Sequence, residues 1–521
     1  MPATRAPRYP ALYQMNVRAR LSELAAELGR RATLDDLPDA ELDGLARDGF
    51  DLVWLLGVWQ TGEAARHVSA GNPGWVVEYR RVLPDFRDED VCGSCFAIRA
   101  YRVHDDFGGD AALARLRGRL RARGLRLLLD FVPNHVAPDH RWVEEHPDFL
   151  VAGDDGRLAA EPDNWRRLRT GRGEQVVAYG RDPYFPGWPD TLQLDWSNPA
   201  LQEAMLGELL SIARRCDGVR CDMAMLILPD VFARTWGRAA PPFWERATAA
   251  VRAAVPGFLF MAEVYWDLEW TLQQQGFDYA YDKRLYDRLV HGEAAAVRGH
   301  LRAGLDFQDR LARFLENHDE PRAAATFAPE AHRAAAVITY FAPGLRFFHQ
   351  GQREGRRVRI PVHLRRGPSE VPDPSLAAFY ARLLVGLRDP SFRDGEWSLL
   401  EPRAAWEGNG SHDAFIACAW TGPGERRRLV AVNFAPHASQ CYLSPPWEDL
   451  PGRTWRLVDR MGEATYEREG IELATRGLYL DLPAWGFHAF EVVTSRQPAA
   501  RASAPSARRP ERPLAPGTAA T

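Results

Sequence analysis

The chain has 521 residues, of which 46% are hydrophobic and 26% charged, a composition typical of a soluble globular protein. This length predicts two or three domains. The net charge of −4 gives no electrostatic reason to expect a nucleic acid or an acidic membrane as a partner. The first residues include no apolar stretch of signal-peptide length, and no segment approaches the roughly 20 apolar residues of a membrane span. We therefore expect a cytoplasmic protein.

Eight short apolar segments before about residue 350 predict β-strands, and helical patterns separate most of them. Strands that alternate with helices pair in parallel, and eight of them fit a closed (β/α)8 TIM barrel of the α/β class. Gly124 is a fitting end for a helix over 112–124, and Asn198 with Pro199 marks a helix start. The predicted strands are 11–17, 51–57, 125–132, 218–223, 258–264, 277–282, 311–317 and 344–349.

The rest of the chain divides by composition. We assign the catalytic barrel to 1–394, with an insertion at 136–190 after the third strand that walls one side of the site. From 395 to 495, short alternating runs broken by Gly, Pro and Asn predict a C-terminal antiparallel β-sandwich. The tail 496–521 lacks large apolar residues and is predicted to be disordered.

Three carboxylates, Asp222, Glu263 and Asp319, each follow an apolar strand. Residues just past the carboxyl ends of barrel strands face the active-site mouth. Arg220 precedes Asp222 by two positions, so both side chains point to one face and the guanidinium would keep the carboxylate charged. The pattern therefore indicates carboxylate chemistry.

Four segments, 130–135, 218–222, 262–266 and 316–322, resemble the short sequence blocks of the alpha-amylase family (glycoside hydrolase family 13), and they occur in the family's order. The resemblance covers roughly 11–490. It implies that Asp222 is the nucleophile, that Glu263 is the acid/base, and that Asp319 binds sugar hydroxyls and supports the transition state. It also implies that His135 and His318 hydrogen-bond the sugar in the cleavage subsite.

Each assignment has a structural alternative. Asp222 and Arg220 could be a structural ion pair, Glu263 a helix-start residue and Asp319 a helix cap. We count Arg220, Asp130 and Arg322 among the candidate substrate-binding residues. For Asp130, a scaffold role is the alternative, and for Arg322 it is a surface or structural role.

Aromatic rings suit the apolar faces of sugars, and the candidates for stacking are Trp59, Trp188 and Trp266.

The sequence also departs from the family pattern. MAML follows Asp222 where many starch-degrading members have a Lys-His pair, which weakens the assignment as an endo-acting amylase. Cys95 stands about where many members carry a stacking Tyr, with Phe96 or Tyr101 as substitutes.

Asn134 matches a calcium-binding position of many amylases. The insertion offers Asp154 and Asp155 but no recognisable ligand set. We therefore predict no cofactor and no metal site, and calcium is unsupported.

Three functions remain open. The first is a retaining glycoside hydrolase that cleaves α-glucosidic bonds of α-linked oligosaccharides or polysaccharides through a covalent intermediate at Asp222. The second is a transglycosylase or isomerase of the same fold that acts on trehalose, sucrose or maltose. These two share the first half-reaction and differ in acceptor access. The third is a non-catalytic carbohydrate-binding protein. The sequence does not specify the oligomeric state.

Overall fold

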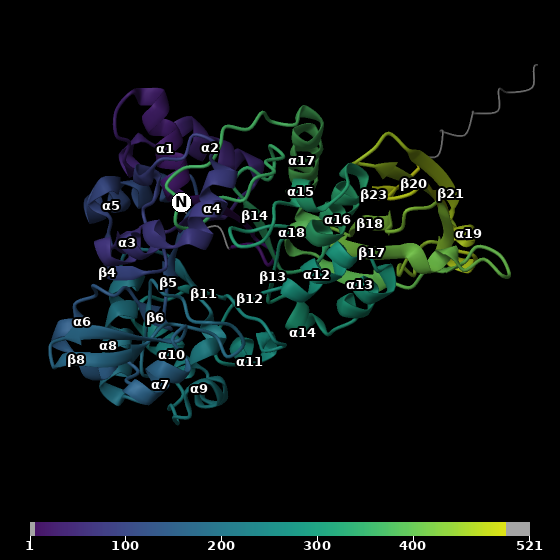
Figure 1. Cartoon of the computed structure of the whole chain (residues 1–521). Coiled ribbons are helices and arrows are strands. Elements are labelled where there is room, and N and C mark those ends of the chain that lie inside the picture. The colour runs from purple at the N-terminus through teal and green to yellow at the C-terminus, as the bar shows by residue number, and fades with distance from the viewer. Residues whose placement is uncertain (1–5, 496–521) are drawn as a thin grey trace, which may run out of the picture.

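The computed structural model of the protein describes residues 6–495. Eight parallel strands form a closed barrel (Figure 1), because the first strand pairs with both the second and the last. All eight predicted strands are barrel strands, so the (β/α)8 prediction is confirmed. They are β1 (Ala11–Asn16), β2 (Leu52–Leu56), β5 (Arg126–Phe131), β10 (Gly218–Cys221), β11 (Leu259–Ala262), β12 (Tyr279–Tyr281), β13 (Leu311–Arg313) and β14 (Leu345–His349).

The barrel strands read as continuous apolar runs because both of their faces are buried. Leu12, Trp54 and Phe347 belong to a cluster that fills the barrel interior. Val53, which precedes Trp54, and Phe348, which follows Phe347, belong instead to the larger core under the helices. This alternation is the pleat of a strand, and it directs polar residues at the strand ends into the barrel mouth.

Helices cover the outside of the barrel. The predicted start at Asn198 is confirmed, since its side chain accepts a hydrogen bond from the Ala200 amide. The helix expected over 112–124 runs from Gly109 to Arg121, and Gly124, at φ +76°, closes the turn after it. The main helices are α1 (Val17–Leu28), α2 (Asp39–Asp48), α5 (Gly109–Arg121), α8 (Pro199–Ala213), α10 (Trp244–Ala254), α12 (Lys283–His291), α13 (Ala294–Leu301), α16 (Pro329–Phe341) and α17 (Pro374–Leu387). Shorter ones are α9 (Pro229–Trp236), α11 (Glu269–Gln274), α14 (Leu305–Gln308), α15 (Ala323–Thr326) and α18 (Pro390–Asp394).

Two excursions leave the barrel. Between β2 and β5 the antiparallel ribbon β3 (Trp59–Thr61) and β4 (Ile98–Val103) encloses α3 (Glu63–Gly71) and α4 (Pro73–Val82), for which we made no prediction.

The second excursion is the expected insertion. It begins at β6 (His135–Val136), which pairs with β9 (Leu192–Gln193). Between them lie α6 (Trp142–Glu145), α7 (Asp155–Ala160) and the hairpin of β7 (Trp165–Thr170) and β8 (Gly173–Ala178). These short elements explain why the sequence shows no clear periodicity there.

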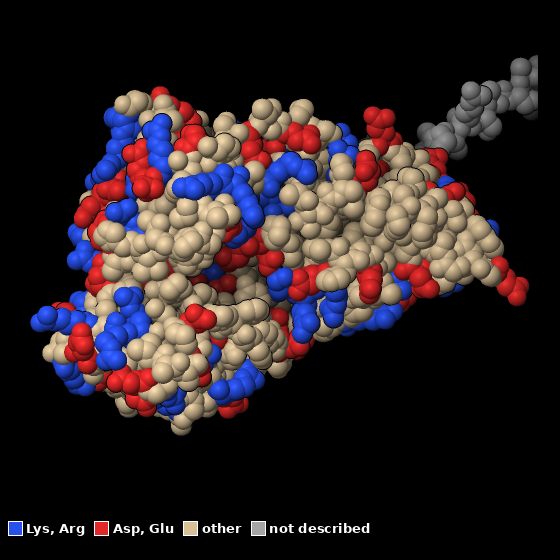
Figure 2. All heavy atoms as spheres, in the orientation of Figure 1, with Lys and Arg blue, Asp and Glu red and all other residues tan. Residues whose placement is uncertain are grey.

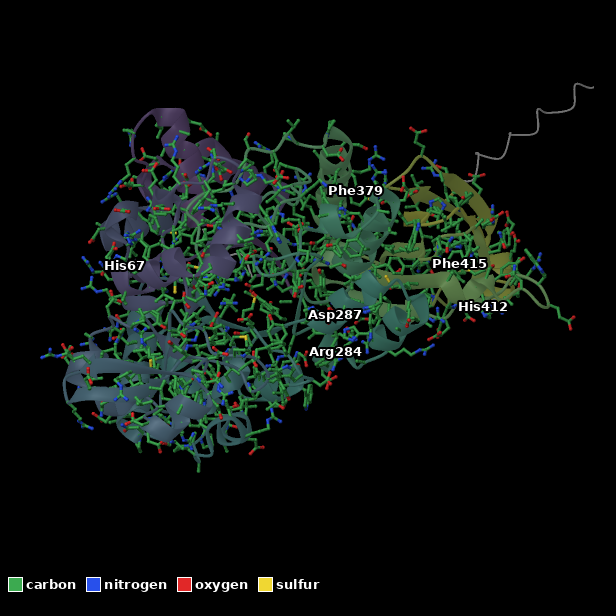
Figure 3. The ribbon with its side chains drawn as sticks, in the orientation of Figure 1. His67, Arg284, Asp287, Phe379, His412 and Phe415 are labelled. Carbon is green, nitrogen blue, oxygen red and sulfur yellow. The ribbon has the colours of Figure 1, made fainter. Side chains whose placement is uncertain are left out.

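A β-sandwich follows the barrel, as predicted, at the yellow-green end of the molecule in Figure 1. Phe415 lies in the core between its two sheets, and Phe379 of α17 contacts Phe487 of the sandwich edge-on at 6.1 Å (Figure 3). The domain limits 1–394 and 395–495 stay predictions, and the predicted disorder of 496–521 lies outside the described residues. The elements of the β-sandwich are β15 (Glu396–Leu400), β16 (Arg403–Ala404), β17 (Phe415–Gly422), β18 (Arg426–Asn433), β19 (Ser439–Leu443), β20 (Thr454–Asp459), β21 (Thr465–Glu469), α19 (Gly470–Thr475), β22 (Leu478–Leu482) and β23 (Phe487–Thr494).

Within residues 6–495, no helix is both long and apolar enough to cross a membrane.

Candidate active site

A cavity of about 440 Å³ opens where the barrel strands end. Acidic atoms lie in a hollow near the middle of the face drawn in Figure 2. The excursion after β2, the insertion and the segment after β14 complete the wall of the cavity. The cavity brings together predicted residues from distant parts of the chain, namely His135, Trp188, Asp222, Glu263 and Asp319.

One buried guanidinium holds two of the three carboxylates. Arg220 Nη1 lies 2.6 Å from Asp222 Oδ1, and its Nη2 lies 2.6 Å from Glu263 Oε2. The guanidinium packs over the rings of Phe96 and Trp54 at 5.0 and 5.3 Å, which leaves it little freedom. Arg220 is fully buried and does not line the cavity, so its contacts are to the carboxylates and not to the cavity itself.

Glu263 lies in the surroundings that a proton donor needs. Burial is the largest cause that raises the pKa of its carboxyl, to about 8, while the nearby Arg220 charge opposes the shift. Oε2 also accepts from the Met223 amide at 2.8 Å, and Oε1 accepts from the Tyr265 hydroxyl at 2.8 Å. Met223 has a φ of +41°, a strained value for a residue with a side chain, and this turn aims its amide at the acid. Glu263 lies outside any helix, so the helix-start alternative does not hold.

Asp319 lies at the open side of the cavity, with 41% of its side chain accessible. The protein around it nevertheless desolvates the carboxyl and raises its pKa. His318 Nε2 lies 3.0 Å from Asp319 Oδ2, and Gln14 fixes the ring from behind at Nδ1, 2.9 Å away. Asp319 does not cap α15, because the Ala323 amide at the start of that helix donates to Glu316.

Asp130 lies behind the cavity and not in its lining. Its carboxylate accepts from Trp54 Nε1 at 3.1 Å and from the Gly57 amide at 2.8 Å. Gly57 has a φ of +77°, and a Cβ there would lie 2.7 Å from Cys95 Cβ, so this contact requires glycine. Burial raises the pKa of Asp130 to about 7. These contacts favour the scaffold role for Asp130.

Arg322 also lies away from this cavity. Its guanidinium pairs with Glu316 at 3.1 Å and donates to the Gln350 carbonyl at 2.8 Å. Both contacts are buried, so the structure favours the structural alternative over substrate contact. The contacts of Arg322 are therefore those of a structural residue.

The aromatic candidates separate in the structure. Trp188 lines the cavity beside His135, with ring centroids 5.2 Å apart. Burial lowers the pKa of His135, which keeps the ring neutral and able to hydrogen-bond a sugar hydroxyl. Trp59 is fully buried and donates to the Asp130 carbonyl, so it is structural. Trp266 packs against Tyr184 at 5.0 Å outside the cavity lining.

The structure also shows where the residues that depart from the family pattern lie. Phe96, and not Cys95, lines the cavity, and it packs at 5.3 Å from the His318 ring. Tyr101 is turned away and donates to the Val132 carbonyl at 3.0 Å. Of the two proposed substitutes, Phe96 is therefore the one at the site. The run after Met223 forms a fully buried 3-10 helix, Ala224–Ile227, and brings no charge to the cavity.

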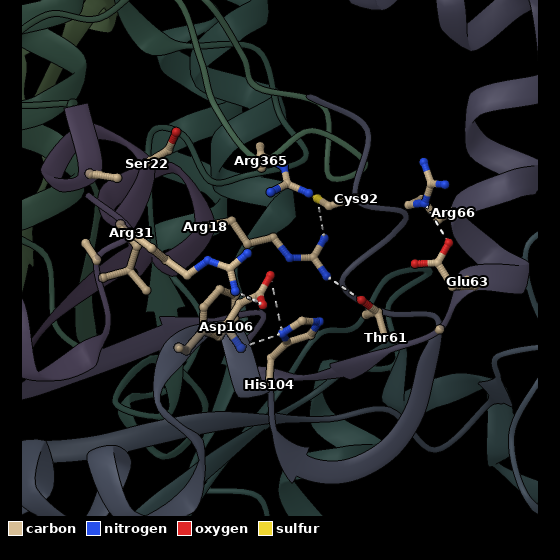
Figure 4. A pocket seen from close by; sticks show the side chains of 15 residues that line it. Arg18, Ser22, Arg31, Thr61, Glu63, Arg66, Cys92, His104, Asp106 and Arg365 are labelled. Carbon is tan, nitrogen blue, oxygen red and sulfur yellow. Dashed lines mark hydrogen bonds and ion pairs between the residues drawn. The ribbon is translucent and has the colours of Figure 1, made fainter. Parts of the chain in front are cut away.

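Figure 4 shows a second cavity, of about 330 Å³. Arg18 is one of the residues that line it. Its Nη1 donates to the Gly93 carbonyl and, at 3.3 Å, to the Val362 carbonyl, while Nη2 donates to Thr61 Oγ1 at 3.1 Å. It thereby ties together two segments, at residues 93 and 362, that contribute neighbouring residues to the catalytic cavity.

No group of three or more His, Cys, Asp or Glu side chains in the described part of the chain is placed to hold a metal ion. Asn134, at the calcium-like position, accepts a hydrogen bond from Gln193 at 3.0 Å. Asp154 caps α7, and Asp155 pairs with Arg167.

Sequence reasoning missed Trp75, Ser94, Asp190, Val362 and His363, all of which line the cavity. Trp75 lies on α4, and its ring stacks on His363 at 4.2 Å. None of these residues belongs to a motif, and only the fold brings them near the carboxylates. The 17 Trp residues of the chain were the one available signal, and among the missed residues that signal concerns Trp75 alone.

We expect the Tyr265 hydroxyl to influence the pH at which activity falls on the alkaline side, because it donates a hydrogen bond to Glu263. Tyr265→Phe removes a donor to Glu263, and a donor stabilises the charged carboxylate, so the variant should raise the pKa of Glu263 further. The acid must be protonated to act, and kcat/KM should fall as pH rises through this pKa. We expect the alkaline limb of the kcat/KM–pH profile to lie near 8 in the wild type and at higher pH in the variant. A limb unchanged in Tyr265→Phe would contradict this role.

Comparisons with known proteins agree with this geometry. A sequence profile described as the alpha amylase catalytic domain matches residues 96–363, just over half of the chain. Alpha-amylase MalA of Haloarcula japonica is 27% identical over 443 residues, which cover 83% of this chain and 57% of that protein. Trehalose synthase/amylase TreS of Mycolicibacterium smegmatis is 28% identical over 205 residues, 35% of this chain and 32% of that protein. The chain thus spans less than two thirds of the length of either relative.

Solved structures share the fold. A noncanonic maltogenic alpha-amylase, AmyB from Thermotoga neapolitana, superposes with a TM-score of 0.66 at 17% identity, covering 94% of this chain and 99% of that one. The alpha-amylase of Geobacillus thermoleovorans, complexed with acarbose, gives 0.63 at 18% identity, with the same two coverages. The profile match, the barrel and the four sequence blocks together lead to one conclusion: the chain belongs to the alpha-amylase family.

Proposed function

We propose that the protein is a retaining glycosidase that acts on α-glucosidic bonds of oligosaccharides. The observation that carries the proposal is the shared Arg220 guanidinium, which pairs with Asp222 and Glu263 in one cavity. Two carboxyl groups held by one guanidinium are close neighbours, and retaining enzymes keep theirs about 5 Å apart. The two groups also differ in their surroundings: only Glu263 accepts hydrogen bonds from the Met223 amide and the Tyr265 hydroxyl.

In the first step, Asp222 attacks the anomeric carbon while the bond to the leaving oxygen breaks and Glu263 gives that oxygen its proton. In the second step, Glu263 takes a proton from a water as the water oxygen attacks the same carbon, and the ester to Asp222 breaks. His135 and Asp319 line the cavity and supply hydrogen-bonding groups for the sugar hydroxyls, and Phe96 supplies an apolar face.

The second candidate is transfer of the glycosyl unit to a sugar acceptor. It is favoured by the similarity to TreS, whose name combines a synthase and an amylase. Both functions use the same first step and differ in whether water or a sugar meets the covalent intermediate.

Product analysis tests both proposals. We expect purified protein given maltose, trehalose, sucrose or a short α-glucan to release free reducing sugar as its main product, because the proposed acceptor is water. Chromatography of timed samples, together with NMR of the first product anomer, gives the readout. Retention of the α anomer supports the mechanism, whereas the β anomer contradicts it. New disaccharides as the main product would show that the protein transfers the glycosyl unit to a sugar instead of to water.

The binding-only alternative makes a different prediction, namely sugar binding without turnover across the same panel. The complete set of Asp222, Glu263 and Asp319 in one cavity argues against it. The cytoplasmic location stays a prediction that cell fractionation can test.

A further inference from the structure

We propose that Asp190, together with His363 and Trp75, forms a recognition subsite that selects uncharged sugars and rejects phosphorylated ones. This inference deepens the proposed function and rests on it for the identity of the site. The three residues come from the insertion, the segment after β14 and α4, and they line the same cavity as the catalytic carboxylates.

Asp190 is a buried acid that lacks a partner on one oxygen. It is 2% exposed, and within residues 6–495 its Oδ2 has no hydrogen-bond donor. Burial raises the pKa of this carboxyl to about 7. A buried carboxyl oxygen without a donor is costly, and native proteins rarely leave one unsatisfied. Because this side chain lines the cavity, a hydroxyl group of a bound sugar is the natural donor.

The surroundings hold His363 in place beside this acid. His363 Nε2 lies 3.7 Å from Asp190 Oδ2, too far for a hydrogen bond but close enough for one sugar hydroxyl to contact both. The His363 ring stacks on Trp75 at 4.2 Å, and the His363 carbonyl accepts from the Cys92 amide at 2.8 Å. Burial lowers the pKa of His363 to about 3, so this ring is neutral and adds no positive charge.

The charge of the cavity explains the rejection of phosphate. Four acids line it, Asp190, Asp222, Glu263 and Asp319, and within the described chain its lining includes no Arg or Lys. The Arg220 guanidinium behind them is already bound to two of these acids. Arg359, whose charge lowers the pKa of Asp319, is itself paired with Glu78 at 2.6 Å. A phosphate dianion in this cavity would meet carboxyl groups and no unpaired lining cation. The dianion would lose its water without gaining a partner of opposite charge, and any ionised acid of the lining would repel it as well.

The test compares sugars that differ by one phosphate: trehalose with trehalose 6-phosphate, and maltose with maltose 1-phosphate. Binding is measured by calorimetry on the full chain carrying Asp222→Asn, so that it does not depend on turnover. We expect the neutral member of each pair to bind at least about tenfold more tightly. If wild-type protein turns over none of these sugars, the proposed function fails, while the binding comparison still decides this inference.

The role of Asp190 is tested in the same background with Asp190→Asn. This change replaces one carboxyl oxygen by an NH2 group that cannot accept a hydrogen bond, so the neutral sugars should bind about 10- to 100-fold more weakly and the penalty for phosphate should shrink. In otherwise wild-type protein the loss should appear in KM more than in kcat. Asp182→Asn is the matched control, because Asp182 is a buried acid of the same segment whose oxygen accepts from the Tyr184 amide outside the cavity lining. It should leave every affinity unchanged.

Two results would overturn the inference. One is a phosphorylated sugar that binds as tightly as its neutral partner. The other is an Asp190→Asn variant that keeps its wild-type melting temperature and binds the neutral sugars normally. If Asp190→Asn lowers the melting temperature, Asp190→Glu serves as the second variant. It keeps the charge and displaces the carboxyl, so it should retain the rejection of phosphate while weakening neutral binding, and loss of that rejection would count against the proposal.

Discussion

Asp222→Asn and Glu263→Gln should each lower kcat at least about 10³-fold, which corresponds to about 4 kcal/mol of lost transition-state stabilisation. Asn offers no anionic oxygen to form the covalent intermediate, and Gln has no acidic proton to give the leaving oxygen. Both replacements keep the size of the side chain and an oxygen that can accept from Arg220. Steady-state rates on the best substrate, with melting temperatures as a folding check, measure the effect. Near-normal activity in either variant would contradict the assignment.

Small anions can distinguish the two roles. In Asp222→Ala, azide should attack the anomeric carbon directly as the leaving group departs and give a β-glycosyl azide. In Glu263→Ala, the covalent ester still forms from a substrate with a good leaving group. Azide then displaces Asp222 and gives the α product. The two anomers are separable by NMR. The reverse pattern would exchange the roles of the two carboxylates.

Arg220→Met should destabilise the protein by about 3–5 kcal/mol at pH 8, because it leaves buried carboxylates without their cation. The loss should depend on pH with a defined sign. The folded-state pKa of Glu263 is raised to about 8, so the folded protein binds protons that the unfolded chain releases. Removing Arg220 raises this pKa further. Below about pH 8 the carboxyl is protonated in both folded proteins, so its contribution to the deficit is constant there. The deficit grows as pH rises above about 8, where the wild-type carboxyl ionises beside Arg220 and the carboxyl of the variant stays protonated.

Thermal unfolding of wild type and Arg220→Met at pH 7 and pH 9.5 measures this prediction. The gap in melting temperature should be larger at pH 9.5. Arg365→Met is the control, since Arg365 is an exposed arginine that lines the second cavity, and it should change stability by about 0.5 kcal/mol or less. An equal gap at both pH values would show that Arg220 stabilises the fold by packing alone.

The sequence predicted some residues of the candidate site correctly and not others. Asp222, Glu263, Asp319 and His135 share one cavity because each follows a strand whose carboxyl end opens at the barrel mouth. Arg322 stands in the same sequence block as Asp319, but its side chain points to Glu316 instead. Block membership predicts which loop a residue is on, whereas side-chain direction depends on partners from other loops.

The sequence by itself determined the eight barrel strands, the β-sandwich and the positions of the three carboxylates, because buried strands leave an apolar periodicity and catalytic acids stand at its ends. Only the tertiary structure decided that Arg220 joins Asp222 to Glu263, that Phe96 faces the cavity, and that Asp190 meets His363. Local patterns record how a residue sits on its own strand or helix. Contacts between residues far apart in the chain, such as Arg220 with Glu263 and Asp190 with His363, arise only when the barrel closes and its loops pack.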